Sequence, residues 1–318
     1  MTNVSRFGFD SVTDEVLDGI DLTGRLALVT GASGGLGEET ARALAARGAS
    51  VVMAARDMAK GEAAAETIRA STGNSDVAVT ELELDSLESV RACAKRFLAE
   101  HDRLNLLINN AGVMACPFAR THDGFEMQFG TNHLGHFVLT NLLAPALLAG
   151  APARVVNLSS GGHRMSDVLF DDPNFERTEY DKFVSYGQSK TANILFSVEL
   201  DRRLRERGVR AYAVHPGAIP TELGRHMQRA DVEQLMASRP GGAKMQLKQV
   251  PAGAATSCYA ASSPDLADRG GIYLEDCGVA EVRDENAMTG VRSYALDPES
   301  AVRLWSLSEE LVGERFEP

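Results

Sequence analysis

The sequence predicts an α/β protein built on one doubly wound, mostly parallel sheet of seven strands with helices on both faces. Three observations indicate this fold class. Short runs rich in Val, Leu and Ile recur along the chain, longer segments rich in Ala, Glu, Lys and Arg separate them, and a glycine-rich turn follows the first run. The apolar runs are nearly continuous, which is typical of strands that helices cover on both sides.

Each apolar run gives one expected strand, and these lie at 26–30, 50–54, 77–82, 104–108, 154–158, 210–214 and 271–274. Helices are expected at 35–47, 58–70, 86–101, 124–148, 185–207, 251–262 and 298–312. Two long segments, 161–184 and 219–250, show neither pattern, and connections of that length usually serve as lids or binding loops. We therefore expect one domain over 25–318, a surface N-terminal extension at 1–24, and a substrate lid at about 219–250.

The composition argues against several classes of protein. With 44 acidic and 32 basic side chains among 318 residues, the formal charge is −12, whereas a nucleic-acid-binding protein needs a basic face. The N-terminus lacks a signal-peptide pattern, and no apolar stretch is long enough for a membrane anchor, so a cytoplasmic protein is expected. The four cysteines are widely spaced, which predicts free thiols rather than a zinc site or a disulfide framework: Cys93, Cys116, Cys258 and Cys277.

The segment "LALVTGASGGLGEETARAL" places four glycines between the first strand and the first helix. A turn at this position can approach a pyrophosphate only if its residues lack a Cβ, and the amides of the helix N-terminus then bind the phosphates. We therefore predict a dinucleotide-binding turn at Gly31, Gly34, Gly35 and Gly37.

The end of the second strand indicates which dinucleotide is bound. A protein that uses NAD typically offers Asp or Glu to the ribose there, but this chain has Arg56, followed by Lys60. Because a guanidinium can donate two hydrogen bonds to a 2′-phosphate, NADP is favoured over NAD. We interpret the intervening Asp57 as the N-cap of a helix.

Several motifs follow one another in a characteristic order: "TGASGGLG", "LD" at 84–85, "NNAG" at 109–112, "NHLGHF" at 132–137, "VVNLSS" at 155–160, "YGQSK" at 186–190 and "HPGAIPT" at 215–221. Together they resemble the short-chain dehydrogenase/reductase family, which has a Rossmann-type fold. The segments "FDSVTDEVLDGIDLTG", "AARDMAKGE", "FGTNHLGHF" and "GGIYLEDC" are closer to its retinol-dehydrogenase-like and WW-domain-oxidoreductase-like branch. The resemblance covers about residues 9 to 312.

The resemblance implies a role for individual residues. Tyr186 would be the general acid/base, Lys190 its activator, Ser160 the donor to the substrate oxygen, and Asn132 a relay residue. Cofactor contacts are implied for Gly31, Ser33, Gly34, Gly35, Leu36, Gly37, Arg56, Lys60, Leu84, Asp85, Asn110, Ala111, Gly112, Tyr186, Lys190, Pro216, Gly217, Ile219 and Thr221.

The tyrosine and lysine also make chemical sense by themselves. A phenol is a poor base at neutral pH, and residues four apart lie on one helical face, so Lys190 is expected to lower the pKa of Tyr186. Ser160 directly follows a strand at the edge where open α/β sheets bind ligands, with Ser159 as the alternative. Ser185 and Gln188 have the spacing of a capping box that would start the helix.

The substrate side is predicted from the composition of the lid. Its apolar residues suit a cover over a hydrophobic ketone, aldehyde or alcohol, although ordinary helix packing would need the same side chains: Leu223, Met227, Leu235, Met236, Met245 and Leu247. His133 and His136 are one turn apart, but no further ligand has metal-site spacing, so no metal is expected.

Two other functions stay open, and so does the oligomeric state. "YGQSK" and the glycine spacing also occur in nucleotide-sugar epimerases and dehydratases, whereas "NNAG", the "HPG" turn and "GIYLEDC" argue against that class. A non-catalytic NADPH-binding regulatory protein would not need Ser160, Tyr186 and Lys190 together. The helix after Tyr186 is apolar on more than one face, which predicts a homodimer or homotetramer.

Overall fold

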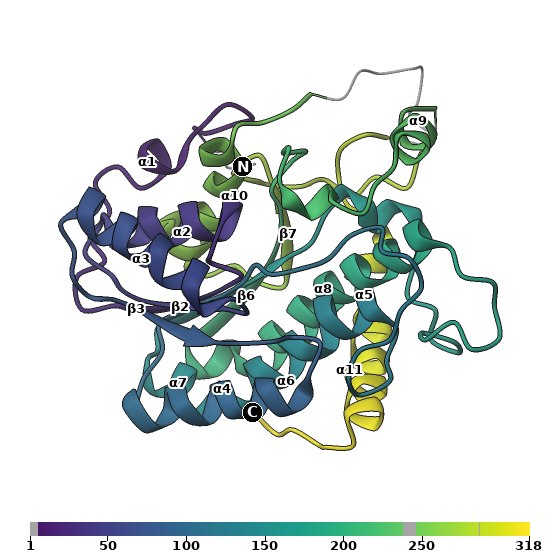
Figure 1. Ribbon diagram of the computed structural model, residues 1–318, viewed down its shortest axis with the longest axis horizontal. Helices are drawn as coiled ribbons and strands as arrows, with labels where there is room; N and C mark the ends of the chain where they lie inside the picture. The colour runs from purple at the N-terminus through teal and green to yellow at the C-terminus, as the bar shows by residue number, and fades with distance from the viewer. Residues whose placement is uncertain (1–5, 238–245, 286) are drawn as a thin grey trace.

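The computed structural model describes residues 6–237, 246–285 and 287–318 (Figure 1). One sheet runs through it in the order β3-β2-β1-β4-β5-β6-β7-β8. Its strands are β1 (Leu26–Thr30), β2 (Ser50–Ala55), β3 (Val77–Glu81), β4 (Leu106–Asn109), β5 (Ala153–Leu158), β6 (Val209–His215), β7 (Ile272–Glu275) and β8 (Gly278–Val279). The predicted fold class is confirmed, with one strand more than predicted.

The additional strand is the two-residue β8, which pairs antiparallel with β7. The chain reverses between them at Asp276 and Cys277, whose φ angles of 49° and 57° are left-handed. All the other strand pairs are parallel. A strand this short contains no apolar run, so the sequence pattern could not predict it.

Helices cover both faces of the sheet (Figure 1). One layer holds α1 (Thr13–Val16), α2 (Gly35–Ala45), α3 (Met58–Thr72) and α10 (Val250–Ser262); the other holds α4 (Leu87–Glu100), α6 (Gly135–Leu142), α7 (Ala144–Ala149), α8 (Lys182–Leu204) and α11 (Pro298–Val312). Alternate residues of β1 enter the two cores, Leu26 and Leu28 on one face and Ala27 and Val29 on the other. The sheet therefore lies between two hydrophobic layers, as its continuous apolar strands require.

The predicted helix at 124–148 is divided in the structure. It consists of α5 (Met127–Phe129), a π-helical turn over Gly130–Leu134, and then α6 and α7. A π turn inserts one residue into the helical ladder and is often found at functional sites. Periodicity alone cannot reveal such an insertion, because every residue of the turn is buried.

The helix that carries Tyr186 begins earlier than predicted. Its first residue is Lys182, and the N-cap is Asp181, whose Oδ1 accepts hydrogen bonds from the Phe183 and Val184 amides at 2.7 and 2.9 Å. Ser185 is fully buried inside the helix. The capping-box interpretation of Ser185 was therefore wrong, because the stronger carboxylate cap lies one turn upstream.

The two segments predicted to be irregular contain short helices. A 3₁₀ turn at Gly161–Met165 follows β5, and a 3₁₀ turn at Glu222–Gly224 and α9 (Arg229–Ala237) lie in the predicted lid. Met245, one of the apolar residues assigned to the lid, lies outside the described residues. In the N-terminal segment, Val16 and Leu17 are buried in the core cluster beside α2 and α10, so this part is more than a surface extension.

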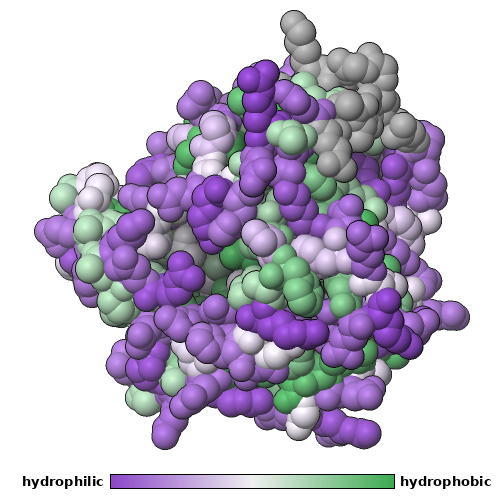
Figure 2. Space-filling view, turned by 45° about the vertical axis from the view of Figure 1, so that its right-hand side comes forward, coloured by the Kyte–Doolittle hydropathy of each residue, from purple (hydrophilic) through white to green (hydrophobic). Residues whose placement is uncertain are grey.

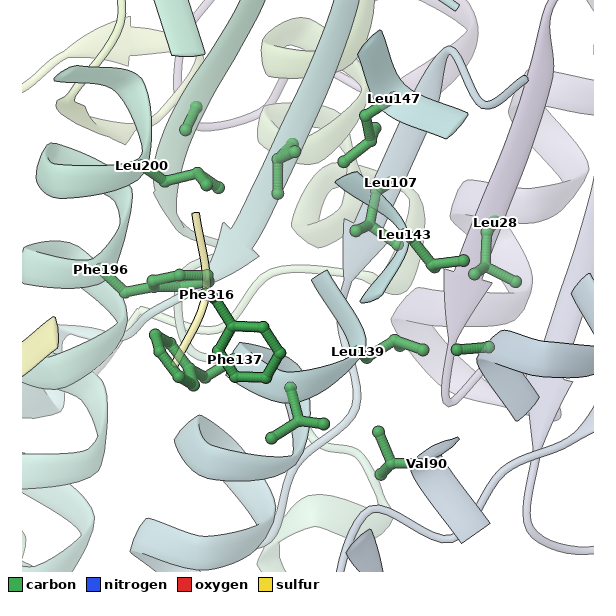
Figure 3. Packing of buried hydrophobic residues seen from close by; sticks show 14 of the residues in the cluster. Leu28, Val90, Leu107, Phe137, Leu139, Leu143, Leu147, Phe196, Leu200 and Phe316 are labelled. Atoms are coloured by element: carbon green, nitrogen blue, oxygen red, sulfur yellow. The ribbon is translucent and has the colours of Figure 1, made fainter. Parts of the chain in front are cut away.

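The apolar faces of α8 are covered within this chain. Phe196 packs against Phe137 with ring centres 5.5 Å apart, and Phe316 completes the group, as Figure 3 shows. Trp305 of α11 closes the same cluster, 5.0 Å from the Phe137 ring. The free face from which we predicted an oligomer is therefore occupied by α11. The oligomeric state itself stays a prediction, which light scattering would test.

Candidate active site

A pocket of about 2320 Å³ opens along the carboxyl edge of the parallel strands. Much of its lining comes from the segments that follow β1, β2, β3, β4, β5, β6 and β7 and from the first half of α8. Every predicted site residue except Asn132 lines it: Gly31, Ser33, Gly34, Gly35, Leu36, Gly37, Arg56, Lys60, Leu84, Asp85, Asn110, Ala111, Gly112, Ser160, Tyr186, Lys190, Pro216, Gly217, Ile219 and Thr221. The fold thus brings together residues that are up to 190 positions apart in the sequence.

The glycine turn forms one end of this pocket. A Cβ on Gly37 would lie 2.3 Å from the Gly31 carbonyl oxygen and 2.5 Å from Asn110 Nδ2, so only glycine allows α2 to approach β1 this closely. A Cβ on Gly34 would meet no atom within 4 Å and would face open space. The turn therefore leaves an uncovered cradle at the N-terminus of α2, which suits a pyrophosphate.

Asn110 stabilises the turn from the neighbouring strand. Its Nδ2 donates to the Thr30 carbonyl at 2.8 Å. In return, the Thr30 hydroxyl oxygen accepts the Asn110 and Ala111 amides at 2.9 and 3.0 Å. These bonds tie the ends of β1 and β4 together. The side-chain amide of Asn110 thus stabilises the glycine turn from below, and Asn110 also lines the pocket.

The residues after β2 provide positive charge at the pocket wall. Asp57 Oδ1 accepts the Lys60 amide at 3.0 Å, so the N-cap prediction is confirmed. Arg56 and Lys60 are exposed and line the pocket. Within the part of the chain that the structure describes, neither side chain forms an ion pair with an acidic residue. Two cations therefore remain available to a ligand.

Ser160 and Tyr186 meet at the pocket floor. Ser160 follows β5, and its side chain lies close enough to Tyr186 to affect the pKa of the phenol. Ser160 Oγ also accepts the Gly162 amide at 3.0 Å, which fixes the side chain. By contrast, Ser159 is buried and donates to the Lys190 carbonyl at 2.8 Å. The geometry therefore favours Ser160 as the partner of Tyr186.

Lys190 lies beside Tyr186 on the same face of α8. Its Nζ is 5.6 Å from the centre of the tyrosine ring and donates to the Leu158 carbonyl at 3.0 Å. Burial lowers the pKa of Lys190 to about 8. Burial also raises the pKa of Tyr186 to about 12, and the Ser160 side chain opposes this rise. The net shift of the Tyr186 pKa is upward because desolvation dominates, and the lowering by Lys190 stays a prediction.

Asn132 supports the site from behind the pocket wall. It is fully buried in the π-helical turn. Its Oδ1 accepts the Val113 amide at 2.8 Å, and its Nδ2 donates to the Val113 carbonyl at 3.0 Å and to Ser189 Oγ at 2.9 Å. Since Ser189 lies between Tyr186 and Lys190 in α8, Asn132 connects the loop after β4 to the helix that carries both.

The sequence reasoning missed the role of His215. Its Nδ1 accepts the Gly161 amide at 3.1 Å and the Gly217 amide at 3.3 Å. The ring thus joins the loop that carries Ser160 to the loop that carries Gly217. Burial lowers the pKa of His215 to about 3, so the imidazole is neutral and Nδ1 is free to accept. A histidine that directly follows an apolar strand was the available signal.

The remaining part of the pocket is mostly apolar. Of the residues predicted for the lid, four line the pocket, whereas Met236 does not: Leu223, Met227, Leu235 and Leu247. Five methionines among the described residues do so as well: Met114, Met127, Met165, Met227 and Met288. Because Met side chains are flexible and polarisable, such a wall adapts to apolar ligands of irregular shape. Phe9 also lines the pocket, a contribution that the sequence did not reveal.

Other candidate sites have structural explanations. His133 Nε2 contacts Ser308 Oγ at 2.8 Å and His136 Nε2 contacts Thr30 Oγ1 at 2.9 Å, so both rings are held by protein groups. The four cysteines are buried and free. Among the described residues, no cluster of three or more potential ligands could hold a metal ion, and no helix combines the length and apolarity needed to cross a membrane. The surface seen in Figure 2 is largely hydrophilic, with smaller hydrophobic areas between.

Comparisons with known proteins identify the family of this chain. Residues 25–231 match the family model described as short chain dehydrogenase. Retinol dehydrogenase 12 of Mus musculus is 45% identical over 94% of this chain and 89% of its own length. Retinol dehydrogenase 13 of Homo sapiens is 44% identical over 92% of this chain and 86% of its own length.

Solved structures show the same similarity. An uncharacterised protein from Mycobacterium paratuberculosis is 39% identical, with a TM-score of 0.72 over 95% of this chain and 98% of that one. The NADP complex of RhlG from Pseudomonas aeruginosa is 27% identical, with a TM-score of 0.62 over 80% of this chain and 95% of that one. The chain therefore belongs to the short-chain dehydrogenase/reductase family, is similar to the retinol dehydrogenases within it, and is an oxidoreductase that uses a nicotinamide dinucleotide.

Proposed function

We propose that this protein interconverts a lipophilic ketone or aldehyde and its alcohol, with NADP(H) as the cofactor. The observation that carries the proposal is that Ser160, Tyr186 and Lys190 line one pocket together, with Lys190 Nζ 5.6 Å from the centre of the Tyr186 ring and a largely apolar, Met-rich end beside them. The relatives named retinol dehydrogenase support a lipophilic substrate, because retinol is itself such an alcohol.

NADP fits the polar end of the pocket. The cradle at Gly34 can accept a pyrophosphate, and Arg56 and Lys60 stand on the same wall as charges without an acidic partner in the described structure. A 2′-phosphate offers these cations a dianionic partner that NAD lacks. We therefore prefer NADP, and the RhlG complex with NADP is a relative that supports this choice.

Tyr186 is assigned the proton transfer. The nicotinamide, when bound, supplies or accepts the hydride, so the protein must move one proton at the substrate oxygen. In reduction the Tyr186 hydroxyl donates that proton, while the Ser160 hydroxyl donates a hydrogen bond to the same oxygen. The positive charge of Lys190, 5.6 Å from the ring centre, then stabilises the tyrosinate that remains. Asn132 fixes the position of α8 relative to the loop after β4 through its hydrogen bonds with Ser189 and Val113.

The proposal is tested with Tyr186→Phe. We expect turnover of a panel of ketones and aldehydes with NADPH to fall by about 100-fold or more, which is typical for the loss of a general acid. The dissociation constant for NADPH, measured by fluorescence, should change little, because only a hydroxyl is removed. Tyr180→Phe is the matched control, since Tyr180 donates to the Cys116 carbonyl and has no assigned role in proton transfer. Wild-type turnover by Tyr186→Phe would refute the mechanism.

The choice of cofactor is tested by binding rather than by activity. Arg56→Ala should weaken NADPH binding by about tenfold, in line with the loss of a charge-assisted hydrogen bond, and leave NADH binding almost unchanged. Arg103→Ala is the control, because Arg103 is exposed and precedes β4 at the opposite edge of the sheet. Tighter binding of NADH than of NADPH to the wild-type protein would contradict the assignment.

The two alternative functions differ in their support. The family match and the dehydrogenase relatives leave the nucleotide-sugar epimerase or dehydratase interpretation without support, so we do not carry it forward. A non-catalytic NADPH-binding protein predicts that Tyr186→Phe changes nothing, so the same experiment decides it. A cytoplasmic location stays a proposal that cell fractionation would test.

A further inference from the structure

Helix α9 is attached to the rest of the molecule in an unusual way. It contributes Val232 and Leu235, three positions apart, to the apolar wall of the pocket, yet Val232 is 45% exposed. Among the side chains of α9 that the structure describes, Asp231 is the one that is buried. A helix held mainly by apolar packing would bury its apolar residues most deeply. Here the buried side chain is a carboxylate.

Asp231 has two partners. Its Oδ2 accepts the Gln228 amide at 2.7 Å, which caps the start of α9. Its Oδ1 lies 2.5 Å from Nζ of Lys182, the first residue of α8. The side chains of Lys182 and Asp231 are 29% and 10% exposed, so this ion pair is better shielded from water than an ordinary surface pair. Lys182 lies one helical turn before Tyr186.

We propose that the Lys182–Asp231 ion pair is a latch that fastens α9 to the helix carrying Tyr186 and thereby holds Val232 and Leu235 over the substrate end of the pocket. Both residues are positioning residues, because they act through the apolar wall and touch no reacting atom. The inference deepens the proposed function, on which its effect on turnover rests. Segments with few buried apolar contacts open most easily, and α9 stands apart from the main helix layers (Figure 1).

A matched pair of variants tests the latch directly. Asp231→Asn removes the charge but keeps an oxygen that can cap the Gln228 amide, and Lys182→Gln removes the other charge. The control is Glu233→Gln on the same helix, which breaks the exposed Arg229–Glu233 pair, 2.8 Å long and 93% and 64% exposed. Asp231→Asn and Glu233→Gln change the net charge equally, so only the latch distinguishes them.

The first measurement does not depend on any activity. Hydrogen–deuterium exchange of the α9 backbone should be about two to five times faster in Asp231→Asn and Lys182→Gln, and unchanged in Glu233→Gln. The double variant Lys182→Gln/Asp231→Asn should match the single variants, because a broken pair cannot be broken again. Exchange at the wild-type rate in Asp231→Asn, or equal acceleration by Glu233→Gln, would overturn the proposal.

The second measurement links the latch to the substrate. With NADPH, KM for decanal should rise about two- to fivefold in both latch variants with little change in kcat, because a long substrate reaches the wall formed by α9. KM for propanal should be unchanged. An equal rise for both aldehydes would overturn the assignment to the pocket wall. If the wild-type protein reduced no aldehyde or ketone, the proposed function would fail, while the exchange experiment would still decide the latch.

Discussion

The ring of His215 joins two loops of the site, and replacing the ring removes the connection between them. The His215→Leu substitution removes the acceptor that the Gly161 and Gly217 amides share. A buried amide without a partner costs about 1–3 kcal/mol. Because His215 lines the pocket, where water can reach it, we take the lower value of about 1 kcal/mol for each amide. The free energy of unfolding should therefore fall by about 2 kcal/mol, and Tm by roughly 4 °C.

The same substitution should slow the reaction, because Gly161 is the residue after Ser160. Small displacements of a positioned group are costly, and we expect kcat to fall about tenfold or more. His215→Asn should recover part of both losses, since the amide oxygen can accept a hydrogen bond where Nδ1 did. Thermal unfolding and steady-state kinetics are the assays, with the exposed His122→Leu as control. A His215→Leu protein with wild-type Tm and kcat would refute the assigned role.

Two further predictions concern stability and the cofactor. Burial lowers the pKa of four histidines from 6.5 to about 3 or 4: His133, His136, His163 and His215. Below pH 6.5 the unfolded chain therefore binds protons that the folded chain does not bind. The folded state has its full stability above pH 6.5 and loses stability as the pH falls. Each of the three fully buried rings, His133, His136 and His163, contributes a loss of roughly 2 kcal/mol by pH 5, and the pocket-lining His215 contributes less. Tm should therefore be clearly lower at pH 5 than at pH 7, and equal values would contradict the burial of neutral rings. Gly37→Ala should lower both Tm and NADPH affinity, because its Cβ would lie 2.3 Å from the Gly31 carbonyl oxygen. Gly34→Ala, whose Cβ meets no atom, should keep the wild-type Tm.

Much of the fold was predictable because its signals are local. Continuous apolar runs gave the strands within a few residues, and Asp57 acts as the predicted N-cap. The errors occurred where a neighbouring side chain or a distant element made an interaction that the pattern did not predict. Asp181 rather than Ser185 caps α8, and Glu126 caps the start of α5 by accepting the Phe129 amide at 2.7 Å. The oligomeric state stays untested, but its argument from a free face of α8 does not hold, because α11, far later in the sequence, packs on α8.

The sequence by itself determined the order of strands and helices, the glycine turn, and which residue types stand at the pocket, because periodicity, the absence of a Cβ and side-chain chemistry are all properties of short segments. Only the tertiary structure decided how these residues act on one another. Burial, which no local pattern measures, raises the pKa of Tyr186 despite Lys190 on the next turn. His215 and the Lys182–Asp231 pair matter because the fold brings together backbone and charges from distant loops, and such proximity exists only once the chain has closed around the pocket.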